Sequence, residues 1–183
     1  NYETVPASVV IIGGGLVGTE AATFFSRLGS KVTILEKSER ILKGVDQVII
    51  KKYEDVLKKK DIDIVTNVNI DRIERIGQKY VILYNDTKVE SEEVFLCIGR
   101  TPYIDNLNLE VAGITLNDGI PNYNPDLTTD NKDIYLAGDI TGLRMYSGWA
   151  FHSAEIAAKN ILGSNLKYTS SVASTILSAD PEI

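Results

Sequence analysis

The sequence predicts an α/β fold: a parallel sheet with helices on both faces, and an antiparallel meander within one crossover. Three observations support this prediction. A short apolar run at residues 9–12 is followed by a glycine-rich turn. Apolar residues at helical spacing come next, and a second β-branched run occupies residues 31–36. This strand–helix–strand order is that of a βαβ unit.

The first helix is expected from Leu16 to the residue before Gly29, since glycine commonly ends a helix. Its expected apolar positions are Val17, Ala21, Phe24, Phe25 and Leu28. A second amphipathic helix should follow, with an apolar face made of Val45, Val48, Ile49, Val56 and Leu57. Residues 62–65 then suggest a third strand.

Short alternating runs between Val68 and Ser91 predict the antiparallel meander, because Gly-Gln and Asp-Thr pairs separate them. Residues 94–98 predict another buried strand. The chain then becomes rich in glycine, proline and asparagine, which indicates loops. Within this part we expect a strand at 133–139 and a helix at about 150–162. The tail, residues 169–183, contains a possible strand without a partner.

The glycines Gly13, Gly15 and Gly18 form the pattern G-x-G-x-x-G between the first strand and the first helix. Such glycines permit a tight turn, the approach of a pyrophosphate, and close packing of helix on strand. Glu36 ends the second strand, where its carboxylate can accept hydrogen bonds from the adenosine ribose and repel a 2′-phosphate. The pattern therefore predicts a Rossmann-like NAD site that disfavours NADP. The alternative is a glycine-rich turn of another α/β domain, with Glu36 a solvated strand end.

Composition narrows the classes of partner. A chain of 183 residues allows one sizeable domain, or one domain and part of another. The net charge of −6 argues against a nucleic acid or an anionic membrane as partner. No apolar run is long enough to span a bilayer. The single cysteine permits neither an internal disulfide nor a thiol-rich metal site, so we expect a cytoplasmic protein without a bound metal.

Three segments together resemble the pyridine nucleotide–disulfide oxidoreductases, in particular the dihydrolipoamide dehydrogenase group. They are IIGGGLVGTEAATFFSRLGSKVTILEKSERIL, VFLCIGRTP and TTDNKDIYLAGDITG. The resemblance implies an NAD-binding domain at residues 1–100, the returning segment of an FAD-binding domain at 101–165, and the beginning of a dimerisation domain at 166–183. The chain would then be the middle of a longer enzyme.

The resemblance also implies roles for particular residues. Asp139 would contact the ribityl chain of FAD; alternatively it caps a turn. Glu20 would support the flavin through a lysine, although an exposed helix acid is a rival interpretation. Val68 would contact the adenine side of the bound NAD; alternatively it is a buried valine of a strand. The implied NAD-binding residues are Gly13, Gly14, Gly15, Leu16, Val17, Gly18, Thr19, Glu20, Glu36, Val68 and Gly99. His152 receives no role, and Cys97 is interpreted as a core residue.

The activity implied is hydride transfer between NAD(H) and FAD, with electrons exchanged with a small-molecule or protein-bound disulfide in a homodimer. That chemistry needs a cysteine pair, which a chain with one cysteine does not hold. The chain alone should therefore be catalytically incomplete, without a catalytic residue of its own. Two alternatives remain: an NADH oxidase or other flavin reductase with the same middle part, and a non-catalytic NAD-binding module.

Overall fold

The computed structural model describes residues 4–169 and 177–181. The chain divides into two compact units, Asn1–Gly99 with Ile176–Ile183, and Arg100–Thr175. The strand suggested for residues 169–183 falls largely outside the described residues. No helix in the described ranges is both long enough and apolar enough to cross a membrane.

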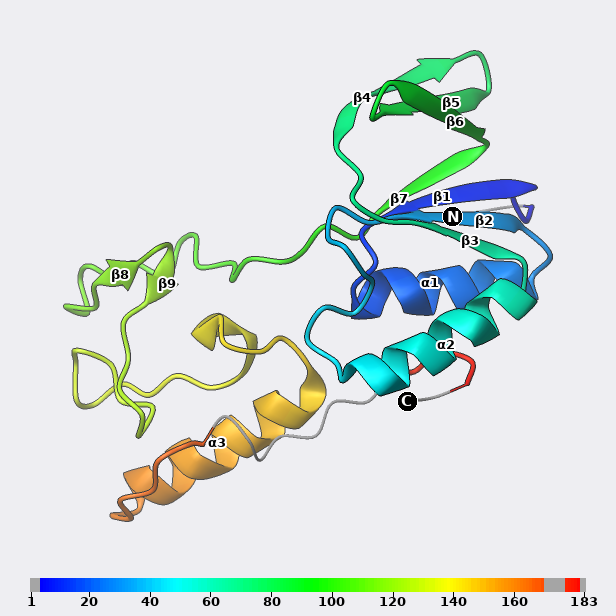
Figure 1. Cartoon of the computed structure of the whole chain (residues 1–183). Helices are drawn as coiled ribbons and strands as arrows, with labels where there is room; N and C mark the ends of the chain where they lie inside the picture. Colours follow the sequence, from blue (N-terminus) through cyan, green and yellow to red (C-terminus); the bar gives the residue numbers. More distant parts are fainter. Residues whose placement is uncertain (1–3, 170–176, 182–183) are drawn as a thin grey trace. The chain divides into compact units, whose positions relative to one another are not determined.

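A four-stranded parallel sheet forms the centre of the first unit (Figure 1). Its strand order is β3-β2-β1-β7. The strands are β1 (Ser8–Ile12), β2 (Lys31–Leu35), β3 (Ile62–Val65) and β7 (Glu93–Leu96). In the register, Val10 of β1 lies opposite Thr33 of β2 and Val94 of β7. The central strand β1 is apolar at every position after Ser8, as expected of a strand buried on both faces.

Two helices cover one face of this sheet: α1 (Leu16–Arg27) and α2 (Gln47–Lys59). Alternate residues of the central strands, such as Ile11 and Ile34, point toward these helices and are fully buried. Phe25 of α1 and Leu57 of α2 pack into the same core. This core fixes the glycine-rich turn, because the turn connects β1 directly to α1.

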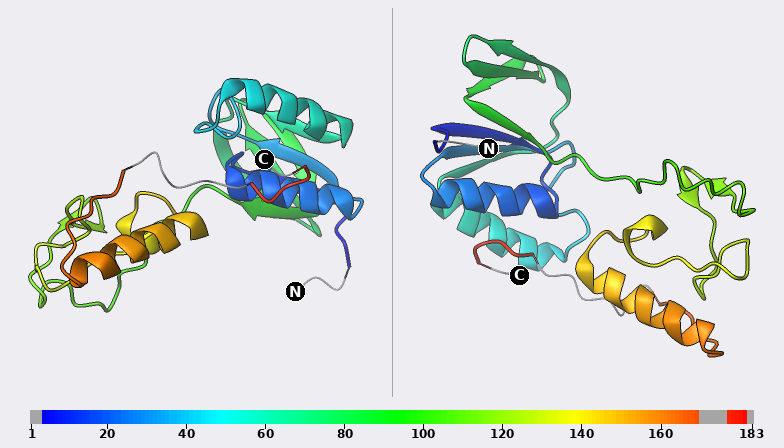
Figure 2. Two further views of the ribbon diagram at one scale, coloured as in Figure 1. Left: turned by 90° about the horizontal axis from the view of Figure 1, so that it is seen from below. Right: turned by 180° about the vertical axis from the view of Figure 1, so that it is seen from behind.

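An antiparallel meander covers the other face. It consists of β4 (Ile70–Ile76), β5 (Lys79–Tyr84) and β6 (Thr87–Ser91), and it joins β3 to β7. Val10 and Ile12 of β1 pack there against Val68 and Ile82. The right-hand view of Figure 2 shows this arrangement from behind, with the helices on one side of the parallel sheet and the meander on the other. The meander is confirmed, whereas the expectation of helices on both faces is corrected: the meander occupies the second face.

The buried faces of both helices agree only in part with the predicted ones: Phe25 and Leu57 are buried as expected, but other predicted positions are not. Val17, Phe24 and Leu28 are 52%, 58% and 47% exposed. The residues of α1 that face the core are Gly18, Thr19, Ala22, Thr23 and Phe25. On α2, Val48 and Ile49 are exposed, and the buried residues are Ile50, Tyr53 and Leu57. Small residues bring α1 close to the sheet, so that of its larger apolar side chains only Phe25 enters the core, while Val17 and Phe24 lie on the outer surface.

The second unit contains the short strands β8 (Leu116–Asn117) and β9 (Ile120–Pro121). They are followed by the 3₁₀ helix η1 (Gly138–Thr141) and by α3 (Ser147–Ile161). Its buried core consists of Leu127, Trp149, Ile156 and Ala157. The strand predicted at 133–139 is wrong: Tyr135 forms an isolated bridge with Thr128, and η1 begins at Gly138. The helix predicted at 150–162 begins three residues earlier, at Ser147.

The segment 177–181 packs onto the first unit. Leu177 is 3% exposed and belongs to the core beneath α1 and α2. The backbone N–H of Ser178 donates to the Glu20 carboxylate at 2.9 Å. Asp180 Oδ2 lies 2.7 Å from Lys60 Nζ and 3.9 Å from Arg27 Nε. This segment therefore ties the outer side of α1 to the end of α2.

Candidate nucleotide-binding site

Three predicted site residues follow the carboxyl ends of neighbouring parallel strands. Gly13 follows β1, Glu36 follows β2, and Gly99 lies three residues beyond β7. Because β1 pairs with both β2 and β7, these strand ends meet at one edge of the sheet. Ligands of open α/β sheets bind at this edge. The fold thus brings the glycine pattern and Glu36 together, as the sequence predicted.

Gly13 and Gly18 are required by close packing. Gly13 has φ of +105°, a conformation that other residues rarely adopt, and a β-carbon there would lie 2.3 Å from the Cys97 carbonyl oxygen. A β-carbon on Gly18 would lie 1.8 Å from the Gly13 carbonyl oxygen. The two glycines therefore let α1 begin directly against β1.

Gly15 differs, because a β-carbon there would meet no protein atom within 4 Å. It is exposed and is the N-cap residue of α1, where no side chain caps the helix. The first-turn N–H groups of an uncapped helix are unsatisfied donors at the positive end of the helix dipole. The first turn of α1 also carries no acidic residue. Open space next to free donors is what a diphosphate group needs.

Two backbone groups orient the Glu36 carboxylate. Its Oε2 accepts the N–H of Gly14 at 2.5 Å, and its Oε1 accepts the N–H of Ser38 at 2.7 Å. Partial burial raises the pKa of Glu36, but the hydrogen bonds from Ser38 and Gly14 outweigh burial and leave this pKa below its usual value. The group is therefore ionised at neutral pH. Each carboxylate oxygen can accept a further hydrogen bond, so both stay available to ribose hydroxyls.

The other residues predicted near the cofactor differ in accessibility. Leu16 is half-buried and Val17 is exposed, so both can meet a ligand. Thr19 is fully buried and its hydroxyl donates to the carbonyl oxygens of Gly15 and Leu16. Its side chain therefore closes the first turn of α1 and does not face a ligand. Val68 is buried in the core, and its N–H donates to the Glu36 carbonyl at 3.0 Å.

Glu20 and Gly99 complete the predicted set in the first unit. The Glu20 carboxylate accepts a hydrogen bond from the Ser178 N–H, so this side chain contacts the segment 177–181. Gly99 is exposed with φ of +128°, and a β-carbon there would meet no atom within 4 Å. Gly99 also ends the first of the two chain segments that form this unit.

Asp139 lies in the second unit, on the 3₁₀ helix η1. Hydrogen bonds fix this turn on α3: the Gly138 N–H donates to Ser153 Oγ, and Trp149 Nε1 donates to Thr141 Oγ1, both at 2.8 Å. Asp139 itself is exposed, and its Oδ2 lies 3.6 Å from a guanidinium nitrogen of Arg100. The carboxylate is therefore accessible and rigidly mounted, as a ligand-binding group requires.

Cys97 and His152 carry no chemistry that the structure supports. Cys97 is half-buried and packs against the core of the first unit, as predicted. Burial raises the pKa of its thiol, which makes it a poor nucleophile at neutral pH. His152 lies beside Trp149, with ring centroids 6.1 Å apart, and its buried Nε2 has no hydrogen-bond partner among the described residues.

The loop after Glu36 was not predicted to take part in the site. Ile41 and Leu42 of this loop are buried, and the Leu42 N–H donates to the Gly14 carbonyl at 2.8 Å. Ser38 supplies one of the two donors to Glu36. The only available signal was an adjacent apolar pair within a charged run, which periodicity does not interpret.

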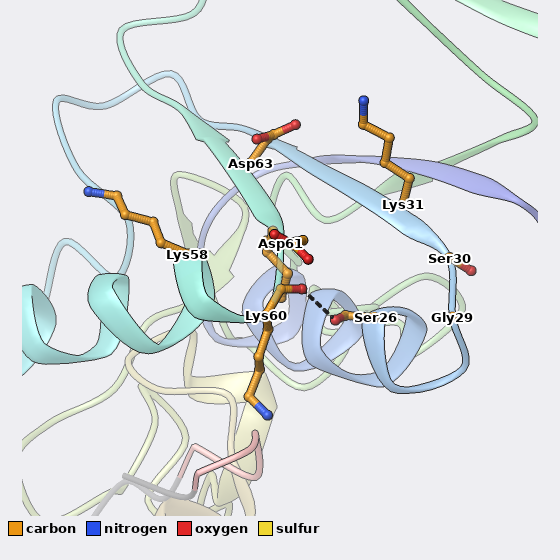
Figure 3. A pocket seen from close by; sticks show the side chains of 9 residues that line it. Ser26, Gly29, Ser30, Lys31, Lys58, Lys60, Asp61 and Asp63 are labelled. Atoms are coloured by element: carbon orange, nitrogen blue, oxygen red, sulfur yellow. Dashed lines mark hydrogen bonds between the residues drawn. The ribbon is translucent and has the colours of Figure 1, made fainter.

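A cavity of the first unit lies away from this edge of the sheet. It has a volume of about 580 Å³ and is lined by the end of α1 and the beginnings of β2 and β3, at the amino ends of the strands (Figure 3). Figure 3 shows its lysines, Lys31, Lys58 and Lys60, pointing away from one another. Lys60 Nζ is bound to Asp180, and Ser26 Oγ donates to the Lys60 carbonyl. The polar groups do not converge, so we assign no ligand to this cavity.

Comparison with known proteins gives a family match for this chain. The family model described as pyridine nucleotide-disulphide oxidoreductase matches residues 1–160. Dihydrolipoyl dehydrogenase of Bacillus subtilis is 32% identical over 182 residues, covering 98% of this chain and 40% of that protein. Mercuric reductase of Bacillus cereus is 32% identical over 167 residues, covering 87% of this chain and 26% of the relative.

Two solved structures share the fold of this chain. The HOCl-induced flavoprotein disulfide reductase RclA of Escherichia coli superimposes with a TM-score of 0.89 and 26% identity, over 100% of this chain and 42% of that one. LpdA of Mycobacterium tuberculosis shares the fold, with a TM-score of 0.91 at 24% identity, over 99% of this chain and 40% of that one. The chain thus spans about 40% of the length of the dihydrolipoyl dehydrogenases it matches.

Proposed function

Because the chain belongs to the pyridine nucleotide-disulphide oxidoreductase family, we propose that it forms the NAD(H)-binding part of a flavoprotein disulfide reductase. In this proposal, residues 1–100 bind NAD(H) and residues 101–165 complete the FAD-binding domain. Residues 166–183 begin the dimerisation domain.

The observation that carries the NAD(H) assignment is the pairing of an uncapped helix N-terminus with an oriented carboxylate. The diphosphate would meet the first-turn N–H groups of α1 above Gly15, where a β-carbon would find only open space. The adenosine ribose would meet Glu36, whose two oxygens are already oriented by backbone donors. A 2′-phosphate at that position would meet a negative charge, so NAD(H) is preferred over NADP(H).

The second cofactor of this family is FAD. Asp139 is the residue of this chain that we assign to it, because its carboxylate is exposed on a turn that α3 holds in place. When both cofactors are bound, they supply hydride transfer between nicotinamide and flavin. The chain's own contribution is to bind and orient them: Gly13 to Gly18 and Glu36 for NAD(H), and Asp139 for FAD.

The complete protein would pass electrons to or from a disulfide, as a homodimer. The names of the relatives support this proposal at the level of the reaction class, since they include dihydrolipoyl dehydrogenases and a flavoprotein disulfide reductase. Cys97, the one cysteine of this chain, is not a candidate for the redox pair, because it is half-buried and its thiol pKa is raised. The disulfide-reacting cysteines would therefore lie outside this span.

Nucleotide titration of the chain tests the NAD(H) assignment. By calorimetry, NADH should bind more tightly than NADPH. Glu36→Gln should weaken NADH binding by about 1–3 kcal/mol, since the ribose loses a charged acceptor. The matched control is Glu39→Gln, an exposed carboxylate three residues away, which should leave the affinity unchanged. Equal affinity of the unmodified chain for NADH and NADPH would contradict the assignment of Glu36.

A further inference from the structure

The loop between Glu36 and α2 closes over the glycine-rich turn. Ile41 is fully buried, and a β-carbon placed on Gly14 would lie 2.5 Å from its Cγ2. Leu42 is 4% exposed, and its N–H donates to the Gly14 carbonyl at 2.8 Å. Both side chains belong to the core beneath the sheet. Ile41 thus contacts the turn with its side chain, and Leu42 contacts it through its backbone N–H.

The Gly14 backbone is consequently held from two directions. Its N–H donates to Glu36 Oε2, and its carbonyl accepts from Leu42. Ile41 leaves no room for a side chain at this position, so Gly14 has to be glycine although the G-x-G-x-x-G pattern leaves it free. The orientation of Glu36 thus depends on the position of Gly14, and the position of Gly14 depends on Ile41 and Leu42.

Leu42 adopts a conformation that signals this constraint. Its φ is +50°, in the left-handed region that a leucine rarely occupies. Such strained residues persist where the surrounding structure requires them. Here the left-handed turn lets the N–H reach Gly14 while the carbonyl accepts from Val45 at 2.8 Å and the side chain stays in the core.

We propose that Ile41 and Leu42 are positioning residues for cofactor choice: they hold Gly14 against Glu36 and thereby set the preference for NAD(H) over NADP(H) without touching the nucleotide. This inference rests on the proposed function. A fixed carboxylate can accept hydrogen bonds from a ribose diol at little entropic cost, and it cannot turn away from a 2′-phosphate. A loosened carboxylate loses both properties, so NADH binds less well and NADPH is rejected less strongly.

The test compares two buried isoleucines of the same core in the full chain. Ile41→Ala removes the contact with Gly14. Ile62→Ala creates a similar cavity at the amino end of β3, the opposite end of the sheet from Gly14. We expect Ile41→Ala to lower the ratio of the NADPH and NADH dissociation constants at least fivefold. Ile62→Ala should change this ratio less than twofold, even where it destabilises the protein equally.

A second measurement needs no nucleotide. Amide hydrogen exchange at the Gly14 N–H, followed by NMR, should accelerate at least tenfold in Ile41→Ala relative to Ile62→Ala, because the hydrogen bond to Glu36 opens more often. If Ile41→Ala does not fold, Ile41→Val removes one methyl group and should shift both readouts in the same direction by a smaller factor.

An unchanged nucleotide ratio in a folded Ile41 variant would overturn the positioning role and leave the proposed function intact. A chain that binds NADH and NADPH equally before mutation would contradict the assignment of Glu36, and the positioning role with it. Measuring NADH and NADPH affinity of the unmodified chain therefore distinguishes a failure of the proposed function from a failure of the positioning role.

Discussion

The carbonyl oxygen of Gly13 faces the Cα of Gly18 so closely that a β-carbon on Gly18 would lie 1.8 Å from it. The obstacle is backbone, which cannot move aside as a flexible side chain does. Gly18→Ala should therefore push α1 away from β1 and lower the free energy of unfolding by about 3 kcal/mol. Urea unfolding followed by circular dichroism measures this change.

For Gly15→Ala we expect the opposite pattern, with little loss of stability and a large loss of NADH affinity. A β-carbon on Gly15 would meet no protein atom, and its φ of −77° suits any residue. The fold should lose about 1 kcal/mol at most, from the less favourable N-cap. The methyl group would however occupy the space above the first turn of α1, so NADH affinity should fall at least tenfold by calorimetry. A Gly15→Ala variant that binds NADH normally would place the diphosphate elsewhere.

Tyr53 of α2 is 2% exposed, and its hydroxyl has no hydrogen-bond partner among the described residues. An unsatisfied buried hydroxyl costs stability, so Tyr53→Phe should raise the free energy of unfolding by about 1 kcal/mol at neutral pH. The matched control is Tyr103→Phe, since Tyr103 is 78% exposed and its hydroxyl is solvated. Denaturation at pH 7 distinguishes the two variants.

Tyr53 should also make the stability of the folded protein depend on pH in the alkaline range. Burial, with the nearby charges of Glu20 and Asp180, raises the pKa of Tyr53 from 10 to about 12. The folded protein therefore keeps a proton that the unfolded chain releases near pH 10. The resulting stability is complete below pH 10 and is lost as pH rises toward 12. Tyr53→Phe should lose less stability than the unmodified chain between pH 9 and 11; an identical loss would contradict the assignment.

Leu177 anchors the segment 177–181 in the core of the first unit, at 3% exposure. Leu177→Ala should destabilise that unit by about 2–5 kcal/mol, as buried leucine truncations do. Leu166→Ala is the control, because Leu166 is 40% exposed and belongs to the second unit. Amide exchange in β1 reports the first unit alone and should accelerate only in Leu177→Ala. Equal protection in both variants would show that the segment does not stabilise the sheet.

The purified chain should not carry stoichiometric FAD. Asp139 offers a charged hydrogen bond worth about 1.5–3 kcal/mol, whereas micromolar affinity requires about 8 kcal/mol. Absorbance near 450 nm after gel filtration with excess FAD measures retention. One flavin per chain would mean that the second unit holds more of the flavin site than Asp139.

Much of the first unit could be predicted because local pattern and tertiary structure agree there. The apolar run of β1, the glycine spacing and the β-branched β2 each favour one structure, and Glu36 directly follows β2 beside the glycine turn. The alternating runs with turn residues between them predicted β4, β5 and β6. The positions of Gly13 and Glu36 could be predicted for the same reason, because both residues follow strand ends. Their role in binding NAD(H) stays a prediction.

The remaining features depend on packing between distant residues. Gly18 and Ala22 face the sheet because α1 approaches it closely, and Phe24 therefore lies on the outer side of the helix. Hydrophobicity alone would predict that Phe24 is buried and Gly18 exposed. The contact of Ile41 with Gly14 joins residues 27 positions apart without a periodic signal. The apolar residues 134–137 predicted a strand over 133–139, but a strand needs a partner. In the described part of the second unit, this segment pairs only through the bridge between Tyr135 and Thr128.

The two units should unfold separately, the second one first. Its buried core contains Leu127, Trp149, Ile156 and Ala157, whereas large apolar side chains such as Tyr103, Phe151 and Leu162 are about four-fifths exposed. The first unit has extensive cores on both faces of its sheet. A smaller buried apolar area gives lower stability. Trp149, the single tryptophan, is 1% exposed and reports the second unit by its fluorescence.

In a urea titration, Trp149 fluorescence should therefore change at a lower midpoint than amide protection in β1, by about 1 M or more. Leu127→Ala should lower the fluorescence midpoint and leave β1 unaffected, since Leu127 is fully buried in the second core. Thr141→Val should act in the same direction, because it leaves the buried Trp149 Nε1 without its acceptor. Coincident transitions in all three proteins would instead show that the two units unfold as one cooperative structure.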